Sequence, residues 1–169
     1  MEDIRNEIRA LEQHANEIGA DAPRRADLMQ EIGIKYGSLY GHTTAASDLG
    51  KIIHYYRKAL DLTPTDGTNR AGLLRNIGMA YLLMYRELKN VQYLVEAITH
   101  VERALEAAPT NGPNRAQILR DLAVAYGQNY EQTREKEDLN ALSLRRVIML
   151  LIFFFPLRSP SKNYLNKQF

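Results

Sequence analysis

Cysteine, histidine and carboxylate side chains supply most catalytic and metal-binding chemistry, and their spacing in this sequence suits neither. There is no cysteine, which excludes disulfides, thiolate zinc sites and cysteine nucleophiles. The four histidines do not fall at the spacings that metal sites use: His14, His42, His54 and His100. The glycine-rich phosphate loops and the Gly-x-Ser-x-Gly nucleophile motif are also absent. We therefore expect a protein that is not an enzyme and that uses no metal ion or other cofactor.

Arginine and tyrosine instead recur at a fixed separation of 45 residues, as from Arg25 to Arg70 and on to Arg115. The tyrosines recur as the pairs Tyr36 and Tyr40, Tyr81 and Tyr85, and Tyr126 and Tyr130. Because residues four apart lie on one face of a helix, each pair is expected to pack against neighbouring helices. Each arginine is expected to make a structural ion pair near a turn between units, with Asp61 or Glu106 as the acceptor.

A repeat of this length is typical of helical arrays, in which each unit stacks on its neighbours. Apolar residues recur every three or four positions, which predicts amphipathic helices. Seven are predicted: residues 2–19, 23–40, 46–62, 68–86, 91–107, 113–131, and one that begins near Lys136. Proline and glycine in Thr63–Gly67 and Ala108–Gly112 mark the turns between units. We predict an all-α solenoid of about seven antiparallel helices, in which three helix-turn-helix units follow a half-unit. That half-unit is either a cap or a piece of a longer array.

The spacing within each unit resembles the tetratricopeptide pattern. In the middle unit the matching residues are Leu74, Ile77, Gly78, Tyr81, Ala97, Val101, Ala104 and Pro109. The small residue at Gly33, Gly78 and Ala123 should let the two helices of a unit approach closely. The long unit is similar to the tetratricopeptide arrays of fungal proteins, in which such arrays accompany a caspase-like CHAT peptidase domain or an NTPase module. The resemblance implies a tetratricopeptide-like solenoid that acts as a sensor or interaction surface. No peptidase or NTPase segment is present, so no activity carries over.

Tetratricopeptide proteins usually bind their ligand in a concave groove lined by the first helix of each unit. The resemblance places nine side chains in that groove: Gln30, Ile34, Ser38, Arg75, Met79, Leu83, Arg120, Val124 and Gln128. A partly apolar groove with two arginines suits an extended peptide or a helix of acidic character. In the alternative interpretation, Met79 and Leu83 pack against the adjacent first helix and the arginines are only solvated. Ile34, Met79 and Val124 stand where a carboxylate clamp of chaperone-tail type needs polar groups, which argues against that clamp.

The composition changes near the end of the repeat. All twenty acids lie at or before Asp138, so residues 1–138 carry a net charge of −3 and residues 139–169 a charge of +5. We divide the chain into a repeat domain at 1–144 and an apolar and basic tail at 145–169. Three interpretations fit the apolar run Val147–Phe155. It is a cap or self-association segment, or a membrane anchor. Alternatively, it is not part of the evolved fold and comes from a gene model that extends past the true end of an exon. For the anchor the run is short, because spanning a bilayer takes about 20 apolar residues.

These features predict a cytoplasmic, non-catalytic scaffold whose partner is a protein or peptide. The body has no basic stripe with interleaved aromatic residues, so nucleic acid is not an expected partner, and neither is a membrane. The charged N-terminal segment does not have the pattern of a secretory signal. Two alternatives are a regulatory segment of a larger peptidase or NTPase, and a tail-anchored membrane adaptor.

Overall fold

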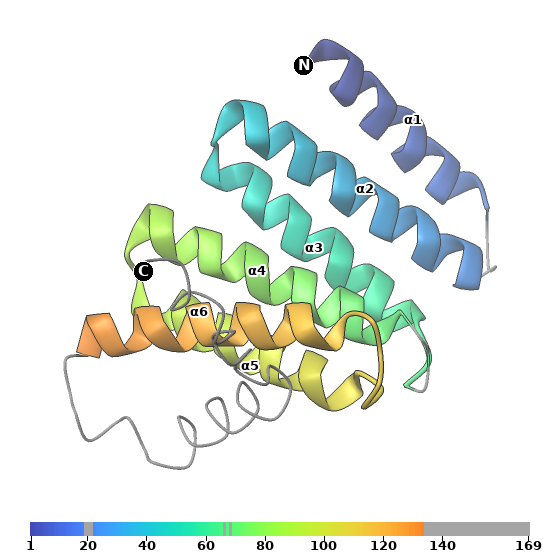
Figure 1. Ribbon diagram of the computed structural model, residues 1–169. Coiled ribbons are helices and arrows are strands. Elements are labelled where there is room, and N and C mark those ends of the chain that lie inside the picture. Colours follow the sequence, from blue (N-terminus) through green and yellow to red (C-terminus); the bar gives the residue numbers. More distant parts are fainter. Residues whose placement is uncertain (19–21, 66, 68, 134–169) are drawn as a thin grey trace, which may run out of the picture.

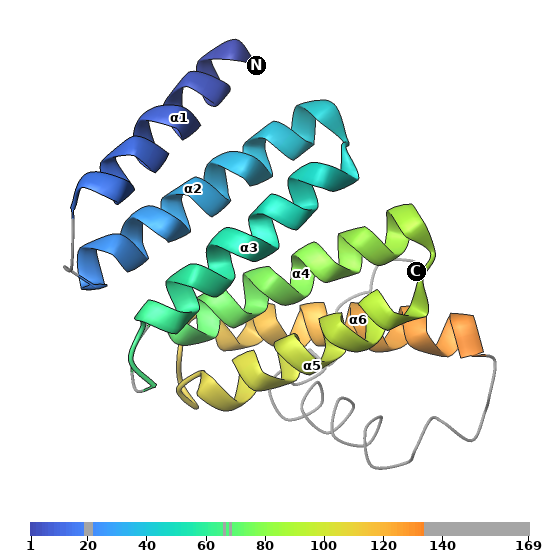
Figure 2. The same ribbon diagram turned by 180° about the vertical axis from the view of Figure 1, so that it is seen from behind.

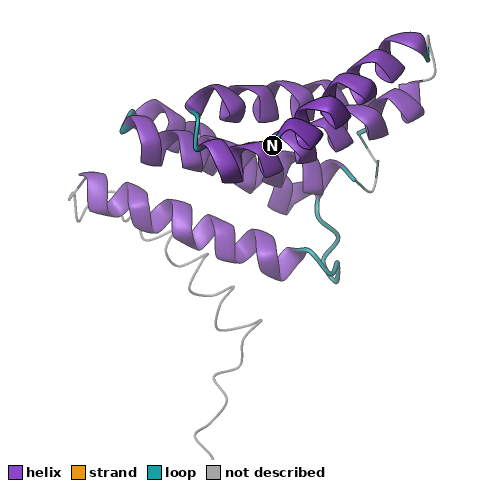
Figure 3. Cartoon of the chain, turned by 90° about the horizontal axis from the view of Figure 1, so that it is seen from above, coloured by secondary structure: helices purple, strands orange, loops and turns teal. Residues whose placement is uncertain are grey.

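The computed structural model describes residues 1–18, 22–65, 67 and 69–133, and within these residues every regular element is a helix (Figure 3). The six helices are α1 (Glu2–Glu17), α2 (Ala22–Thr43), α3 (Ala46–Leu62), α4 (Arg70–Leu88), α5 (Val91–Ala107) and α6 (Arg115–Thr133). The predicted all-α class is confirmed. The seventh helix that was expected from Lys136, and the tail at 145–169, lie outside the described residues.

Two kinds of connection alternate along the chain. Residues 44–45 join α2 to α3 and residues 89–90 join α4 to α5. Thr44 and Lys89 both have positive φ angles, of 51° and 55°, and so reverse the chain within these short links. The longer links 63–69 and 108–114 contain matching turns, in which the N–H of Gly67 donates to the carbonyl of Pro64 and that of Gly112 to the carbonyl of Pro109.

Helix α2 is longer than the sequence analysis predicted, since it continues past Tyr40 to Thr43. Gly37 and Gly41 both lie inside the helix. An isolated glycine in a helix costs only about 1 kcal/mol relative to alanine, which the packing of α2 offsets. The helix ends where Thr43 turns its hydroxyl to the carboxylate of Asp48 and accepts a hydrogen bond from the N–H of Ala45.

Each helix packs mainly on the helices before and after it in the chain (Figures 1 and 2). The contacts are most extensive within the pairs α2–α3 and α4–α5, followed by α3–α4, while α4 also touches α6. Successive helices run antiparallel. The axis of α6 is inclined relative to the axes of α1, α2 and α3 (Figure 1). Packing between sequence neighbours therefore accounts for most of the tertiary structure.

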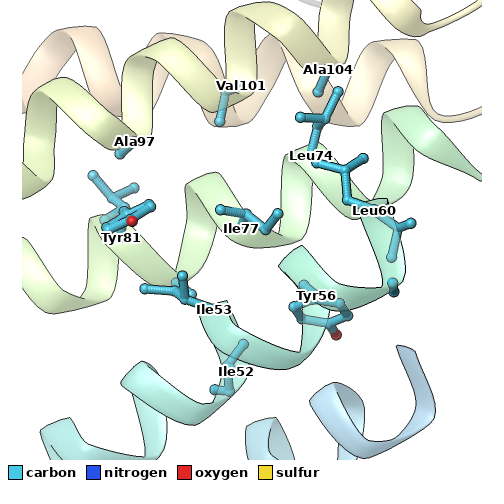
Figure 4. Close-up of a cluster of buried hydrophobic side chains, with 14 of the residues drawn as sticks. Ile52, Ile53, Tyr56, Leu60, Leu74, Ile77, Tyr81, Ala97, Val101 and Ala104 are labelled. Atoms are coloured by element: carbon cyan, nitrogen blue, oxygen red, sulfur yellow. The ribbon is translucent and has the colours of Figure 1, made fainter. Parts of the chain in front are cut away.

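The core runs along the stack as one continuous cluster of apolar side chains. Ile32 of α2, Leu49 of α3, Ile77 of α4 and Leu94 of α5 are all completely buried. Figure 4 shows the centre of this cluster, where side chains of α3 and α4 meet those of α5. Burial of this kind is the main stabilising contribution in a helical stack, at roughly 25 cal/mol per Å² of apolar surface.

Arg70 and Arg115 have the expected structural role near the turns between units, but their acceptors differ from the expected carboxylates. The guanidinium of Arg115 donates to the carbonyl oxygens of Leu105 (3.0 Å) and Ala108 (3.1 Å) at the end of α5. Arg70 donates to the carbonyl of Thr63 (3.3 Å) at the end of α3. The prediction of carboxylate acceptors was therefore wrong. The last carbonyls of a helix have no partner within the helix and carry partial negative charge, so a cation stabilises them.

Candidate functional site

The nine predicted groove residues lie on α2, α4 and α6, three on each helix, and we call this surface the groove face. Its two most exposed apolar side chains are Ile34 on α2, at 48% exposure, and Val124 on α6, at 44%. Met79 and Leu83, on α4 between them, are half-buried against the core. The middle of the groove face therefore follows the alternative interpretation, in which these two side chains pack, while its two ends leave apolar surface open.

The two arginines of the groove face behave differently. Nε of Arg75 donates to the carboxylate of Asp121, a buried residue of α6, so this ion pair joins α4 to α6. Asp121 also accepts a hydrogen bond of 3.3 Å from Gln117. The charge of Arg75 is thus compensated within the fold. Arg120 is exposed and donates to the side chain of Gln117, which leaves its other guanidinium nitrogens toward solvent.

Sequence reasoning missed Asp121, although one signal was present. The equivalent positions in the earlier units are Glu31 and Asn76, so a polar residue of acceptor type recurs there. Asp121 directly follows Arg120, which is the equivalent of Arg75 in the next unit. An acceptor at this position on the first helix of one unit can therefore bind the arginine of the unit before it. This signal depends on knowing which faces of two helices meet, and the repeat alone does not specify that.

The remaining members of the groove face have weaker roles. The Ser38 hydroxyl donates back to the carbonyl of Ile34 (3.3 Å), which is a common use of serine inside a helix. The Gln128 amide, oriented with its oxygen toward Arg86, accepts two hydrogen bonds of 3.0 and 2.9 Å. Gln30 lines a small pocket of about 150 Å³ together with Pro64 and Asn69 of the turn before α4.

The tyrosines lie on other sides of the same helices and form hydrogen bonds that repeat along the stack. Tyr40 of α2 donates to Glu87 of α4 (3.1 Å), and its equivalent Tyr85 donates to Gln132 of α6 (3.0 Å). Each of these bonds links successive first helices. The predicted role in packing is confirmed for the other tyrosines of the three pairs, whereas Tyr130 is exposed. The hydroxyl groups of Tyr40 and Tyr85 in addition connect units.

A second set of repeated bonds links each first helix to the second helix of the preceding unit. Tyr36 donates to Glu12 (3.3 Å) and Tyr126 to Glu102, whereas Tyr81 accepts a hydrogen bond of 2.7 Å from Arg57. The partners of these tyrosines occupy equivalent positions in the repeat, namely Glu12, Arg57 and Glu102. The charge of the partner thus changes sign between units, while the hydrogen bond to the tyrosine is kept. Burial is the main reason why the pKa values of Tyr36 and Tyr81 are raised, so both hydroxyl groups stay protonated at neutral pH.

Within residues 1–18, 22–65, 67 and 69–133, no group of three or more metal-ligating side chains converges. None of the helices described has both the length and the apolar composition that crossing a membrane requires. A larger pocket, of about 390 Å³, lies between α1, α2 and α3, away from the groove face.

Comparison with known proteins adds no further assignment. No family model, no curated protein and no solved structure matches this chain. The candidate site therefore depends on the residues and their geometry alone.

Proposed function

We propose that this chain is a tetratricopeptide-like solenoid that acts as a protein-interaction scaffold and binds a peptide or helix on the groove face. The observation that carries the proposal is the pair Ile34 and Val124. These equivalent positions, two units apart, leave 48% and 44% of their surface exposed, whereas most large apolar side chains of the six helices are covered. Two apolar side chains at one repeat position suit the spaced anchors of an extended peptide or an amphipathic helix.

Charge supports a partner of acidic character. Arg120 lies four residues before Val124, one turn away on the same helix, and keeps its guanidinium exposed. Arg75 is already paired with Asp121, so it orders the groove face and leaves recognition of an acidic group to Arg120. A partner that places apolar side chains on Ile34 and Val124 and a carboxylate near Arg120 would use all three.

The classification as a solenoid is supported by interactions that repeat with the unit. The matching turns at Gly67 and Gly112, the arginines at the ends of α3 and α5, and the Tyr40 and Tyr85 bonds all recur at equivalent positions. Repeated contacts between nearest neighbours are what a stack of equivalent units requires.

The proposal is tested by selecting peptides from a randomised displayed library on the full chain. Ile34→Asp/Val124→Asp should weaken the selected peptides at least about tenfold, because burying even one such side chain contributes roughly 1.5–3 kcal/mol. The matched control is Val91→Asp/Val95→Asp, which changes two exposed valines of α5 outside the groove face. Peptides that bind all three proteins equally, or a library that yields no specific peptide, would refute the assignment.

A further inference from the structure

We propose that the pocket between α1, α2 and α3 is a second binding site, which takes an apolar group bearing a single carboxylate. The pocket is an open hollow of about 390 Å³, a volume within the range of small-ligand sites. Its floor is apolar and comes from Ile8 of α1 together with Tyr36 and Leu39 of α2. Ile8 and Leu39 are almost fully buried beneath it, so the floor is part of the folded core.

Two cations without partners line this pocket from different helices. Arg5 belongs to α1 and Lys51 to α3, and both side chains are exposed. Across the part of the chain that the structure describes, neither side chain makes a hydrogen bond or an ion pair. Arg9, a third cation of the lining, is already held by Glu2 (3.0 Å) and Asn6 (2.6 Å). The cations of the lining that have no carboxylate within bonding distance are therefore Arg5 and Lys51.

The two carboxylates of the lining are occupied by hydroxyl donors. Glu12 accepts hydrogen bonds from Tyr55 (2.5 Å) and Tyr36 (3.3 Å) through one oxygen. Asp48 accepts one from Thr43 at the start of α3. Both acids thus serve contacts between helices or within the α2–α3 turn. An incoming carboxylate has Arg5 and Lys51 as its available charge partners, over a floor that favours an apolar group.

In the next unit an aromatic ring stands at the equivalent place, so the pocket of the first unit is not repeated there. Forty-five residues beyond Asp48 stands Tyr93, whose ring stacks on Tyr81 with centroids 6.2 Å apart. Tyr81 is itself the counterpart of Tyr36 on the pocket floor. The counterparts of Arg5 and Lys51 are Gly50 and Glu96. The second unit thus replaces the open space with an aromatic ring and removes both cations.

This site is independent of the groove face. Tyr36 lies two residues from both Ile34 and Ser38, and two residues turn an α-helix by about 200°. The pocket therefore opens on the opposite side of α2 from the proposed peptide-binding surface. Failure of one proposal leaves the other untouched.

The test titrates the full chain with N-acetyl-leucine and with its neutral amide, followed by ligand-observed NMR. We expect saturable binding of the acid that weakens as salt increases, and at least tenfold weaker binding of the amide. A short peptide that ends in leucine with a free carboxylate distinguishes the sources. Tighter binding of the peptide identifies a peptide C-terminus as the ligand, and equal binding identifies a free small carboxylate.

Variants decide whether the binding occurs in this pocket. Arg5→Gln/Lys51→Gln should weaken N-acetyl-leucine about tenfold or more, since each lost charge-assisted contact is of that order. Arg103→Gln, on an exposed arginine of α5, and Ile34→Asp/Val124→Asp should both leave the affinity unchanged. Circular dichroism checks that each variant is folded. If the double variant does not fold, the same measurement is made on Lys51→Glu. This variant carries the residue that the second unit has at the equivalent position, Glu96.

Equal affinity for the acid and the amide would overturn the proposal. So would unchanged affinity in a folded Arg5→Gln/Lys51→Gln or Lys51→Glu variant, or the absence of saturable binding.

Discussion

At the residue scale, Gly78 marks a close approach between α4 and α5. A Cβ atom added there would lie 2.5 Å from Cγ2 of Val101 and 3.0 Å from the carbonyl oxygen of Ala97. Neither backbone can move without displacing the whole α4–α5 pair. The sequence prediction that a small residue is needed at this position is confirmed.

Gly78→Ala should therefore lower the free energy of unfolding by about 1–3 kcal/mol, even though alanine favours a helix by up to about 1 kcal/mol. Gly72→Ala is the matched control on the same helix, because nothing lies within 4 Å of the added Cβ. It should raise the free energy of unfolding by up to about 1 kcal/mol. Urea unfolding measures both, and a Gly78→Ala protein as stable as the Gly72→Ala protein would contradict the close approach.

His100 is a buried titratable residue between α4 and α5. Its ring lies 5.4 Å from that of Tyr81, and its Nδ1 is 2.9 Å from the carbonyl oxygen of Glu96. Burial lowers the pKa of His100, and repulsion from Arg57 and Arg103 acts in the same direction, against the attraction of Glu96. The side chain is therefore neutral in the folded protein at pH 7.

Stability should consequently fall in mild acid. Between the lowered folded pKa and the unfolded value of about 6.5, the unfolded chain binds more protons at His100 than the folded chain. The stability is thus fully present above about pH 6.5 and is lost as the pH falls through the folded pKa. Urea unfolding from pH 7.5 to 5 should show a smaller loss for His100→Gln than for the original protein. Thr99→Ala, an exposed neighbour on α5, should keep the original pH dependence, and equal slopes in all three proteins would refute this role.

At the element scale, the ends of α3 and α5 are held in the same way in two successive units. Helices α3 and α5 begin and end at the residues that the sequence analysis predicted. Their last carbonyls are held from outside by Arg70 and Arg115. An arginine at the start of the next helix thus fixes the path of the longer link.

Arg115→Met should lower the free energy of unfolding by about 1–3 kcal/mol, because it removes charged hydrogen bonds to two carbonyls at the end of α5. Arg103→Met is the control, since Arg103 is an exposed arginine of α5 itself, and its effect should stay within about 0.5 kcal/mol. Thermal and urea unfolding compare the two. Similar small effects for both arginines would show that Arg115 does not stabilise the end of α5.

At the scale of the whole molecule, stability depends on stacking between neighbours. Helix α3 has its most extensive contacts with α2. Without α2, buried side chains of α3 such as Leu49, Ile52 and Tyr56 lose part of their cover. Under the proposed solenoid architecture, about three units are the minimum for a stable stack.

A fragment of residues 46–144, which lacks α1 and α2, should therefore lose cooperative unfolding. Circular dichroism during urea unfolding of the fragment and of the full chain makes the comparison. A sharp transition in the fragment, close to that of the full chain, would contradict the stacking argument.

The sequence alone determined the repeat, the helical class, and most helix boundaries to within about two residues, because these depend on local rules. Apolar spacing defines which residues share a helix face, and proline and glycine mark the turns. The same rules located Gly78 and the tyrosine pairs as packing residues. The extent of α2 was missed, since packing compensated for two glycines that local preference disfavours.

Only the tertiary structure decided which side chains of different helices meet. It paired Arg75 with Asp121, directed Arg70 and Arg115 to carbonyl oxygens, and left a pocket beside Tyr36 where Tyr93 fills the equivalent space beside Tyr81. These contacts depend on how far each helix is rotated and tilted against the next. A repeat of 45 residues specifies equivalent positions, but small differences between units, such as aspartate in place of tyrosine, change what those positions touch.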